Sequence, residues 1–202
     1  MNIIKRSEWG AREPNYPFKK HSPNKITIHH VGSSDNKPII KSFAGKNSIK
    51  SIESYHIDKR GWNNIGYHYI IAPNGDIYEG RPDDVVGAHV RNHNTNNIGI
   101  NIWCNSDIEV PTDNQIKSLK ELLNNLFKIY NIDIKDVYGH KDLVSTDCPG
   151  TNLYNILNAI KSTWKTPDKE TDILVLLHDI SNQMLILNQK MAKVVEHFNK
   201  HE

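Results

Sequence analysis

Short runs of β-branched residues alternate along this chain with longer segments whose apolar residues recur every three or four positions. The runs KITIHHV (25–31) and NIGINIW (97–103) are typical of β-strands, because β-branched side chains favour a pleated backbone. The segment 113–130 carries one apolar stripe at helical spacing, and Thr112 is a candidate N-cap before it. Strands and helices that alternate over short connections predict a compact α/β domain.

The remaining elements of the expected domain are shorter. Their expected bounds are a helix over 49–59, hairpin strands over 67–72 and 77–80, a strand over 136–140 and a last helix over 153–164. Gly61 is expected to end the first of these helices. Between the hairpin strands, Asn74 and Gly75 are expected to supply the positive φ angles of a tight turn.

Composition excludes several other classes of protein. The 202 residues contain 25 Lys and Arg against 23 Asp and Glu, and a net charge of +2 is too small for a nucleic-acid binder that relies on broad electrostatics. Two cysteines, Cys104 and Cys148, cannot form a disulfide framework, so stability must come from a packed core. No apolar run is long enough for a transmembrane segment, and the N-terminus has no signal-peptide pattern. We therefore expect synthesis in the cytoplasm.

The C-terminal part carries a different pattern. After Pro167, apolar residues alternate four and three positions apart, as in the heptad seam of a coiled coil. The seam residues are Ile173, Leu177, Ile180, Met184, Leu187, Met191, Val194 and Phe198. We expect this helix to self-associate into a homo-oligomer; docking on the parent domain and binding to a membrane or wall surface are the alternatives.

Histidine is the residue in excess, with 11 in the chain, and this prompts a search for a metal site. His29, His140 and Cys148 offer imidazole and thiolate ligands, which suit Zn²⁺ far better than Mg²⁺ or Ca²⁺. Three protein ligands leave a fourth position for water, which is typical of a catalytic zinc. His30 must point to the opposite face of the strand that carries His29, so we expect a core or supporting role for it. Cys104 is expected to be a small buried apolar residue.

Five motifs follow one another in order between Trp9 and Trp164. They are IHHVG (28–32), GWNNIGYHYII (61–71), GRPDDVVGAH (80–89), HNTNNIGI (93–100) and GHKDLVSTDCPG (139–150). Together they resemble the motifs of zinc-dependent N-acetylmuramoyl-L-alanine amidases, a family that includes phage lytic amidases and animal peptidoglycan recognition proteins. The resemblance implies a single mixed β-sheet flanked by helices, within a zinc amidase domain over residues 1–164. Residues 165–202 then form a linker and the heptad helix.

The resemblance also assigns roles to individual residues. It places the zinc ligands on His29, His140 and Cys148, the residues that ligand chemistry also selects. It places the catalytic tyrosine on Tyr67, whose phenol would hydrogen-bond to the scissile carbonyl or to the metal-bound water and stabilise the oxyanion.

Three further positions follow from the resemblance. His89 and Asn94 are expected to bind substrate in the groove. Thr146, the second residue expected to be catalytic, stands where several phage members carry a lysine, so it offers a hydroxyl to orient substrate or water but no positive charge. None of the motifs contains an obvious carboxylate base, which leaves the group that transfers the proton open.

The resemblance implies a peptidoglycan hydrolase that cuts the amide bond between N-acetylmuramic acid and L-alanine with a zinc-activated water. We expect an endolysin of a phage or prophage, which acts on the bacterial cell wall after release from the host cytoplasm. Two alternatives are a non-catalytic peptidoglycan-binding module and a cytosolic amidase that recycles wall fragments. Binding-only relatives usually lack the cysteine ligand, and Cys148 is present here.

Overall fold

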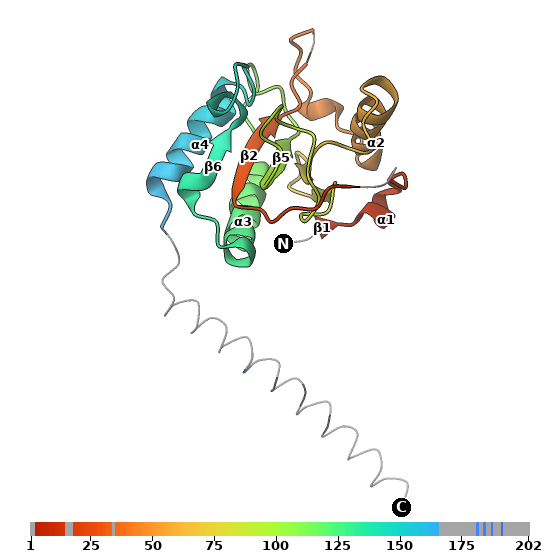
Figure 1. The fold of residues 1–202 in the computed structure, drawn as a ribbon. Helices are drawn as coiled ribbons and strands as arrows, with labels where there is room; N and C mark the ends of the chain where they lie inside the picture. The colour runs from red at the N-terminus through yellow and green to blue at the C-terminus, as the bar shows by residue number, and fades with distance from the viewer. Residues whose placement is uncertain are drawn as a thin grey trace, which may run out of the picture. The chain divides into compact units, whose positions relative to one another are not determined.

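The computed structural model describes residues 3–14, 18–33 and 35–165, together with Ser181, Met184, Leu187 and Met191. The chain divides into two units, Met1–Thr163 and Trp164–Glu202 (Figure 1). The elements of the first unit are β1 (Ile3–Ile4), α1 (Arg6–Trp9), β2 (Lys25–His30), α2 (Lys46–Ser54), β3 (Tyr69–Ile71), β4 (Ile77–Glu79), β5 (Asn97–Ile102), α3 (Asp113–Tyr130), β6 (Val137–Gly139) and α4 (Thr151–Thr163).

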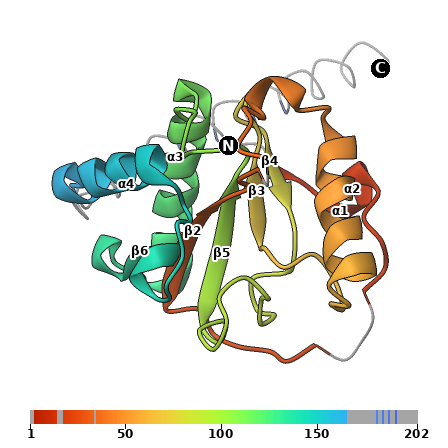
Figure 2. The same cartoon turned by 90° about the horizontal axis from the view of Figure 1, so that it is seen from above.

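The strands form one six-stranded sheet in the order β1-β4-β3-β5-β2-β6. Strands β3 and β4 pair antiparallel, whereas β2 pairs parallel with both β5 and β6. Helices α1 and α2 lie on one side of this sheet, and α3 and α4 lie on the other (Figure 2). The expected single mixed sheet flanked by helices is therefore confirmed.

The two faces of the sheet differ in chemistry. Asn101 of β5 is paired in register with His29 of β2 and with Ile70 of β3, so these three side chains share one face. Ile70 packs there in a buried cluster with Trp9 of α1 and Ile49 of α2. The candidate site therefore lies on the α1 and α2 side of the sheet.

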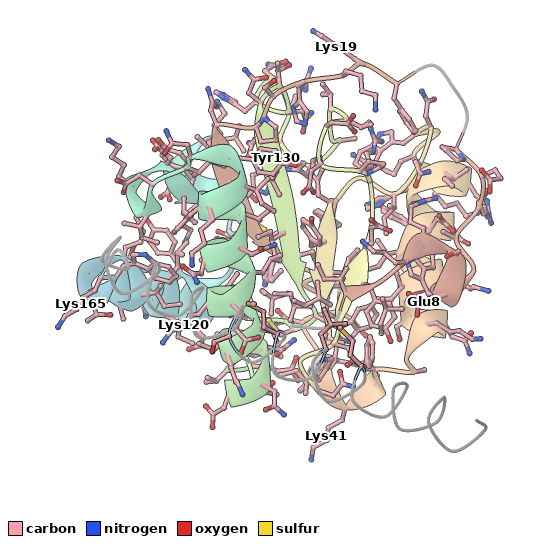
Figure 3. The ribbon with its side chains drawn as sticks, turned by 90° about the horizontal axis from the view of Figure 1, so that it is seen from below. Glu8, Lys19, Lys41, Lys120, Tyr130 and Lys165 are labelled. Carbon is pink, nitrogen blue, oxygen red and sulfur yellow. The ribbon has the colours of Figure 1, made fainter. Side chains whose placement is uncertain are left out.

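The opposite face is apolar along the central strands. Its buried isoleucines are Ile26, Ile28, Ile98, Ile100 and Ile102. The buried stripes of α3 and α4 supply leucines and one isoleucine: Leu119, Leu122, Leu123, Leu126, Leu153, Leu157 and Ile160. Charged side chains such as Glu8, Lys41 and Lys120 point outward (Figure 3). This apolar layer supplies the packed core that a chain without disulfides requires.

Most expected elements are present with small changes in their bounds. The helix over 113–130 is confirmed, and the helix expected over 49–59 begins earlier, at Lys46, and ends in a π-helical turn, Tyr55–Lys59. The strand expected over 136–140 is shorter, because the backbone turns at His140 into a short 3₁₀ segment. Strand β1 and helix α1 are not predictable from the sequence, because they are too short to show a periodic pattern of apolar residues.

The hairpin between β3 and β4 is confirmed, but the role expected for Asn74 is wrong. Gly75 has φ of 91°, whereas Asn74 does not have a positive φ angle. The two strands are joined through a turn in which the Gly75 N–H donates a hydrogen bond to the Ala72 carbonyl. This turn needs a positive φ angle at Gly75 but not at Asn74. The Asn74 side chain instead accepts a hydrogen bond from the Asp76 N–H at 3.1 Å.

Most of the expected heptad helix lies outside the described residues, including Ile173, Leu177, Ile180, Val194 and Phe198. Three seam residues are described: Met184, Leu187 and Met191 are helical, and each is 57 to 60% exposed. Among the helices of the described residues, none has the length and apolar character to cross a membrane.

We expect Thr112→Ala to lower the free energy of unfolding by about 1 to 2 kcal/mol. The Thr112 hydroxyl accepts a hydrogen bond from the Gln115 N–H at 3.1 Å and donates one to the Pro73 carbonyl at 2.7 Å, and alanine loses both. Urea unfolding measures the change. Thr112→Ser is the matched control, because serine keeps the hydroxyl; equal losses in both variants would contradict the capping role.

Candidate functional site

The parallel pairing of β2 with β6 brings two histidines together. Ile28 is paired in register with Gly139, so His29 and His140, each one residue further along, lie side by side. Their ring centroids are 4.5 Å apart. Cys148 reaches the same point from the loop before α4, where its carbonyl accepts a hydrogen bond from the Lys141 N–H at 2.8 Å.

The three groups predicted as metal ligands form one cluster. Potential ligand atoms of His29, His140 and Cys148 all lie within 4.8 Å of one another, and His29 Nδ1 is 3.6 Å from Cys148 Sγ. A tetrahedral zinc with ordinary zinc–nitrogen and zinc–sulfur bonds separates such a pair by about 3.5 Å. The donor chemistry and this spacing both fit Zn²⁺.

Burial keeps the cluster uncharged when no cation is present. Burial lowers the pKa of His29 well below its ordinary value, and His89 and His140 add to that effect. Burial also lowers the pKa of His140 and raises the pKa of the Cys148 thiol to about 12. Both imidazoles are therefore ready to bind a metal, whereas the thiol must first lose its proton.

Tyr67 stands beside this cluster, two residues before β3. Its ring centroid is 5.3 Å from that of His29 and 5.5 Å from that of His56. Burial raises the pKa of Tyr67 above its ordinary value, and the charge of Cys148 raises it further. The phenol therefore stays protonated near neutral pH and is able to donate a hydrogen bond.

Two polar residues of the site were not anticipated from the sequence. Asn101 is fully buried next to Tyr67, and among the described residues neither of its amide atoms has a partner at hydrogen-bond distance, although it is close enough to lower the pKa of the Tyr67 phenol. The sequence signal for Asn101 was a polar residue between Ile100 and Ile102. His56, on the π-helical turn, stacks on Trp62 with centroids 4.6 Å apart, and its Nδ1 accepts a hydrogen bond from the Gly66 N–H. Burial lowers the pKa of His56 to about 4, so it is neutral.

The residues expected to bind substrate are placed around one loop. The Asn94 side-chain oxygen accepts hydrogen bonds from the backbone N–H groups of His89 and Val90, both at 2.8 Å. The His89 ring points inward, and both of its nitrogens lie within hydrogen-bond distance of protein groups. Thr146 uses its hydroxyl oxygen to accept a hydrogen bond from the Cys148 N–H at 3.3 Å.

The two residues given supporting or structural roles are placed as expected. His30 is buried, on the face opposite to His29, and its Nδ1 accepts a hydrogen bond from the Ser106 N–H at 3.0 Å. Cys104 is buried and does not belong to the His29, His140 and Cys148 cluster.

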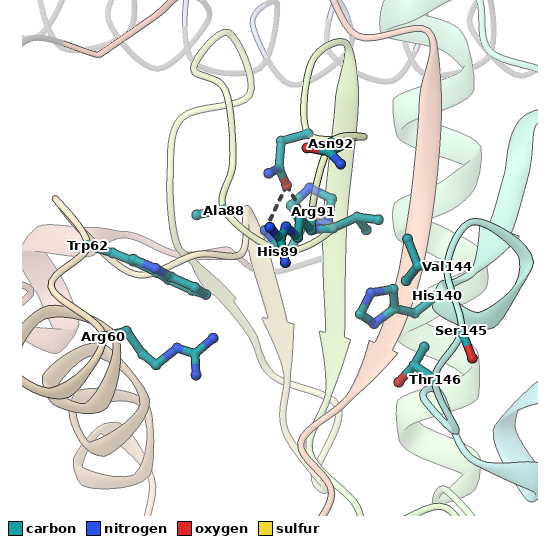
Figure 4. Close-up of a pocket in the computed structure, with 12 residues that line it drawn as sticks. Arg60, Trp62, Ala88, His89, Arg91, Asn92, His140, Val144, Ser145 and Thr146 are labelled. Carbon is teal, nitrogen blue, oxygen red and sulfur yellow. Dashed lines mark hydrogen bonds between the residues drawn. The ribbon is translucent and has the colours of Figure 1, made fainter.

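One pocket borders the cluster at His140, and a second lies beside Tyr67. The larger, of about 740 Å³, has Arg60 and Trp62 on one side and His140 and Thr146 on the other, with Arg91 between them (Figure 4). A smaller pocket of about 260 Å³ is lined by polar and apolar residues from α2, its π-helical turn and the sheet: Val31, Ser51, Ile52, Tyr55, His56, Tyr67, Asn101 and Trp103. His140 thus opens to one pocket and Tyr67 to the other.

Comparison with known protein families identifies the family to which this chain belongs. The model of the family described as N-acetylmuramoyl-L-alanine amidase matches residues 19–151 of the chain. The chain belongs to this amidase family. The resemblance seen in the five motifs is thereby confirmed at the level of the family.

Individual relatives of this amidase-family chain include recognition proteins and an amidase. Peptidoglycan-recognition protein SC2 of Drosophila simulans is 36% identical over 167 residues, which cover 82% of this chain and 89% of that protein. The solved structure of N-acetylmuramoyl-L-alanine amidase LysC from Clostridium intestinale is 31% identical, with a TM-score of 0.66, and the match covers 79% of this chain and 96% of that one. Peptidoglycan recognition protein LE, solved in complex with tracheal cytotoxin, is 31% identical with a TM-score of 0.68, and the match covers 81% of this chain and 94% of that one.

We expect zinc uptake by this amidase-family chain to release at least one proton. The Cys148 thiol, with its pKa raised to about 12, is protonated near neutral pH, whereas each neutral imidazole binds through its unprotonated ring nitrogen and keeps the proton on the other nitrogen. Zinc affinity should therefore rise by about tenfold or more per pH unit near neutrality. Calorimetric titration in buffers of different ionisation enthalpy measures the release.

Cys104→Ala is the matched control for this experiment, because the Cys104 thiol has a similarly raised pKa, about 12, but lies outside the cluster. Its zinc affinity and proton release should equal those of the unaltered chain. Zinc uptake that does not depend on pH would contradict the assignment of Cys148 as a ligand.

Proposed function

We propose that this protein is a zinc-dependent amidase that cuts peptidoglycan between N-acetylmuramic acid and L-alanine. The observation that carries the proposal is the complete cluster of His29, His140 and Cys148 with Tyr67 beside it. Family membership supplies the substrate class, and the cysteine ligand supports cleavage rather than binding alone.

The residues of the site have separate roles in this reaction. His29, His140 and Cys148 would hold Zn²⁺, which when bound polarises a carbonyl and activates water. The Tyr67 phenol donates a hydrogen bond to the oxygen of the scissile carbonyl as negative charge develops there. Because His29 is buried and Tyr67 is partly buried beside it, such a hydrogen bond stabilises that charge more than it would in solvent.

The larger pocket suits an acidic peptide. Arg60 and Arg91 line it, and guanidinium groups bind carboxylates through paired hydrogen bonds. Trp62, whose ring lies 5.4 Å from the Arg60 guanidinium, adds an apolar wall.

The test is release of free amino groups from purified cell walls by the zinc-loaded protein. We expect release by the unaltered chain and by Cys104→Ala, and none by Cys148→Ser, which lacks the thiolate ligand. A zinc-loaded protein that releases no amines would refute the proposal, as would full activity of Cys148→Ser.

The second candidate function is binding of peptidoglycan without cleavage. Relatives named for peptidoglycan recognition favour it, since one of them is solved with a monomeric diaminopimelic acid-type peptidoglycan. The same experiment separates the two functions when sedimentation with cell walls is measured in parallel. Wall binding without amine release or zinc uptake would establish the second candidate.

We expect Tyr67→Phe to lower kcat by about 100-fold or more while zinc content and unfolding remain as in the unaltered chain. Phenylalanine keeps the ring contacts with His29 and His56 but removes the hydrogen-bond donor. The matched control is Tyr130→Phe, which removes a phenol that hydrogen-bonds to Asp83 instead. Unchanged turnover in Tyr67→Phe would remove Tyr67 from the mechanism.

Within this activity we propose the lytic role of an endolysin, which acts on the wall after release from the host cytoplasm. Cutting the bond that joins glycan to stem peptide detaches the cross-links, which supports such a role. A fall in the turbidity of bacteria with permeabilised membranes, seen with the unaltered chain and absent with Cys148→Ser, is the expected result. Amine release from isolated walls without any such fall would favour recycling of wall fragments.

We further propose that the C-terminal segment associates with copies of itself. Met184, Leu187 and Met191 support this, because they are helical, apolar and exposed at the spacing of a heptad seam. Several linked catalytic domains would bind a polymeric wall more tightly through multivalency.

We expect light scattering to give a multiple of the chain mass for the full-length protein and the monomer mass after deletion from Lys165 onward. Leu187→Lys should also reduce the mass, because it places a charge in the seam. Ser181→Lys is the control, since Ser181 is helical and exposed but lies outside the seam. A monomeric full-length protein would rule out self-association.

A further inference from the structure

The His89 ring lies directly behind the metal ligand His29. His89 Nδ1 is 3.1 Å from His29 Nε2, and His89 Nε2 is 3.1 Å from the carbonyl oxygen of Asn97. The other nitrogen of His29, Nδ1, faces Cys148 Sγ. Asn97, His89 and His29 thus form one line of hydrogen-bonding groups, which runs from the β5 backbone to the metal site.

The backbone carbonyl at one end sets the direction of every hydrogen bond in this line. A carbonyl oxygen only accepts, so His89 Nε2 must carry the proton and donate it to Asn97. In a neutral imidazole the second nitrogen is then an acceptor, so His89 Nδ1 accepts from His29 Nε2–H. His29 Nδ1 is left without a proton, which is the form that binds a metal.

Two glycines make room for the His89 ring. A Cβ at Gly99 of β5 would come within 2.6 Å of the ring, and a Cβ at Gly87 would come within 2.5 Å of it. Ordinary contacts are far longer, so any other residue at either position would displace the ring. With His89 only 8% exposed, the local backbone is built as a slot for this side chain.

We propose that His89 is a positioning residue that fixes the tautomer and orientation of His29 for metal binding. The carbonyl of Asn97 sets the protonation of His89, and His89 sets that of His29. This role differs from the substrate binding expected from the resemblance. It rests on the zinc site of the proposed function, although the tautomers themselves exist without the metal.

Loss of the His89 ring has two consequences for His29. The buried Nε2–H of His29 loses its acceptor, and its imidazole gains access to the tautomer that carries a proton on Nδ1, where the metal binds. Changes to the hydrogen-bond partners of metal ligands typically weaken metal affinity by about 10- to 100-fold.

The first test uses the unaltered, metal-free chain, so it does not depend on any variant folding. Long-range ¹H–¹⁵N NMR spectra distinguish protonated from unprotonated ring nitrogens. We expect His29 and His89 both to carry the proton on Nε2 and none on Nδ1. A proton on Nδ1 of either ring would overturn the proposal.

The second test measures zinc dissociation constants by competition with a chelator. His89→Ala should bind zinc about 10- to 100-fold more weakly. His89→Asn should recover most of the affinity, because the asparagine side-chain oxygen stands at the same number of bonds from Cα as Nδ1 and accepts the same hydrogen bond. Unchanged zinc affinity in a folded His89→Ala would overturn the proposal.

His21→Ala is the control for the loss of a partly buried imidazole that joins two backbone groups. His21 Nε2 lies 2.8 Å from the Asp83 carbonyl, and its Nδ1 accepts from the Asn96 N–H at 2.7 Å, but it does not contact His29. Its zinc affinity should equal that of the unaltered chain, and an equal loss in both variants would mean that general destabilisation explains the effect. A chain with the expected tautomers that binds no zinc would refute the proposed function but not the hydrogen-bond line.

Discussion

The parallel pairing of β2 with strands on both sides is the constraint on which the site depends. Strands β5 and β6 both run parallel to β2. The residues that come after the last register pair of β2 and β6 therefore lie next to each other at the same edge of the sheet. His29 and His140 lie at that point, and the loop after His140 needs only a short path to bring Cys148 back. A slip of one residue in β2 would turn His29 into the apolar core and bring His30 out in its place.

The polar face of the sheet is buried almost as completely as the apolar face, so its polar groups must find partners inside the protein. Three histidines serve this need. His21 joins the backbone of Asp83 to that of Asn96, His68 joins the backbone of Val85 to that of Gly99, and His89 joins the backbone of Asn97 to the ring of His29. Much of the histidine excess in the sequence is thus explained by such hydrogen bonds. Of the histidines that the structure describes, two belong to the cluster with Cys148.

The parts of the fold and site that were predictable are those with a local signature. The alternation in KITIHH placed His29 and His30 on opposite faces, and soft ligand chemistry together with the motifs selected His140 and Cys148 before the structure brought them together. The packing of His89 between Gly87 and Gly99 was not predictable, because it depends on contacts between segments far apart in the sequence. The same holds for Asn101, whose lack of partners is visible only once its neighbours are placed.

The neutrality of the buried cluster explains why its support has to be rigid. Uncharged imidazoles and a protonated thiol avoid the cost of a buried charge until a cation is bound. The same neutrality leaves each imidazole two tautomers, of which only one presents a lone pair to the ion. A hydrogen-bond line that ends on a backbone carbonyl removes that choice for His29, because a carbonyl has no second protonation state. The thiol of Cys148 is then the one described group of the cluster whose proton must leave before a cation binds, so the pH dependence expected for zinc uptake comes from that group.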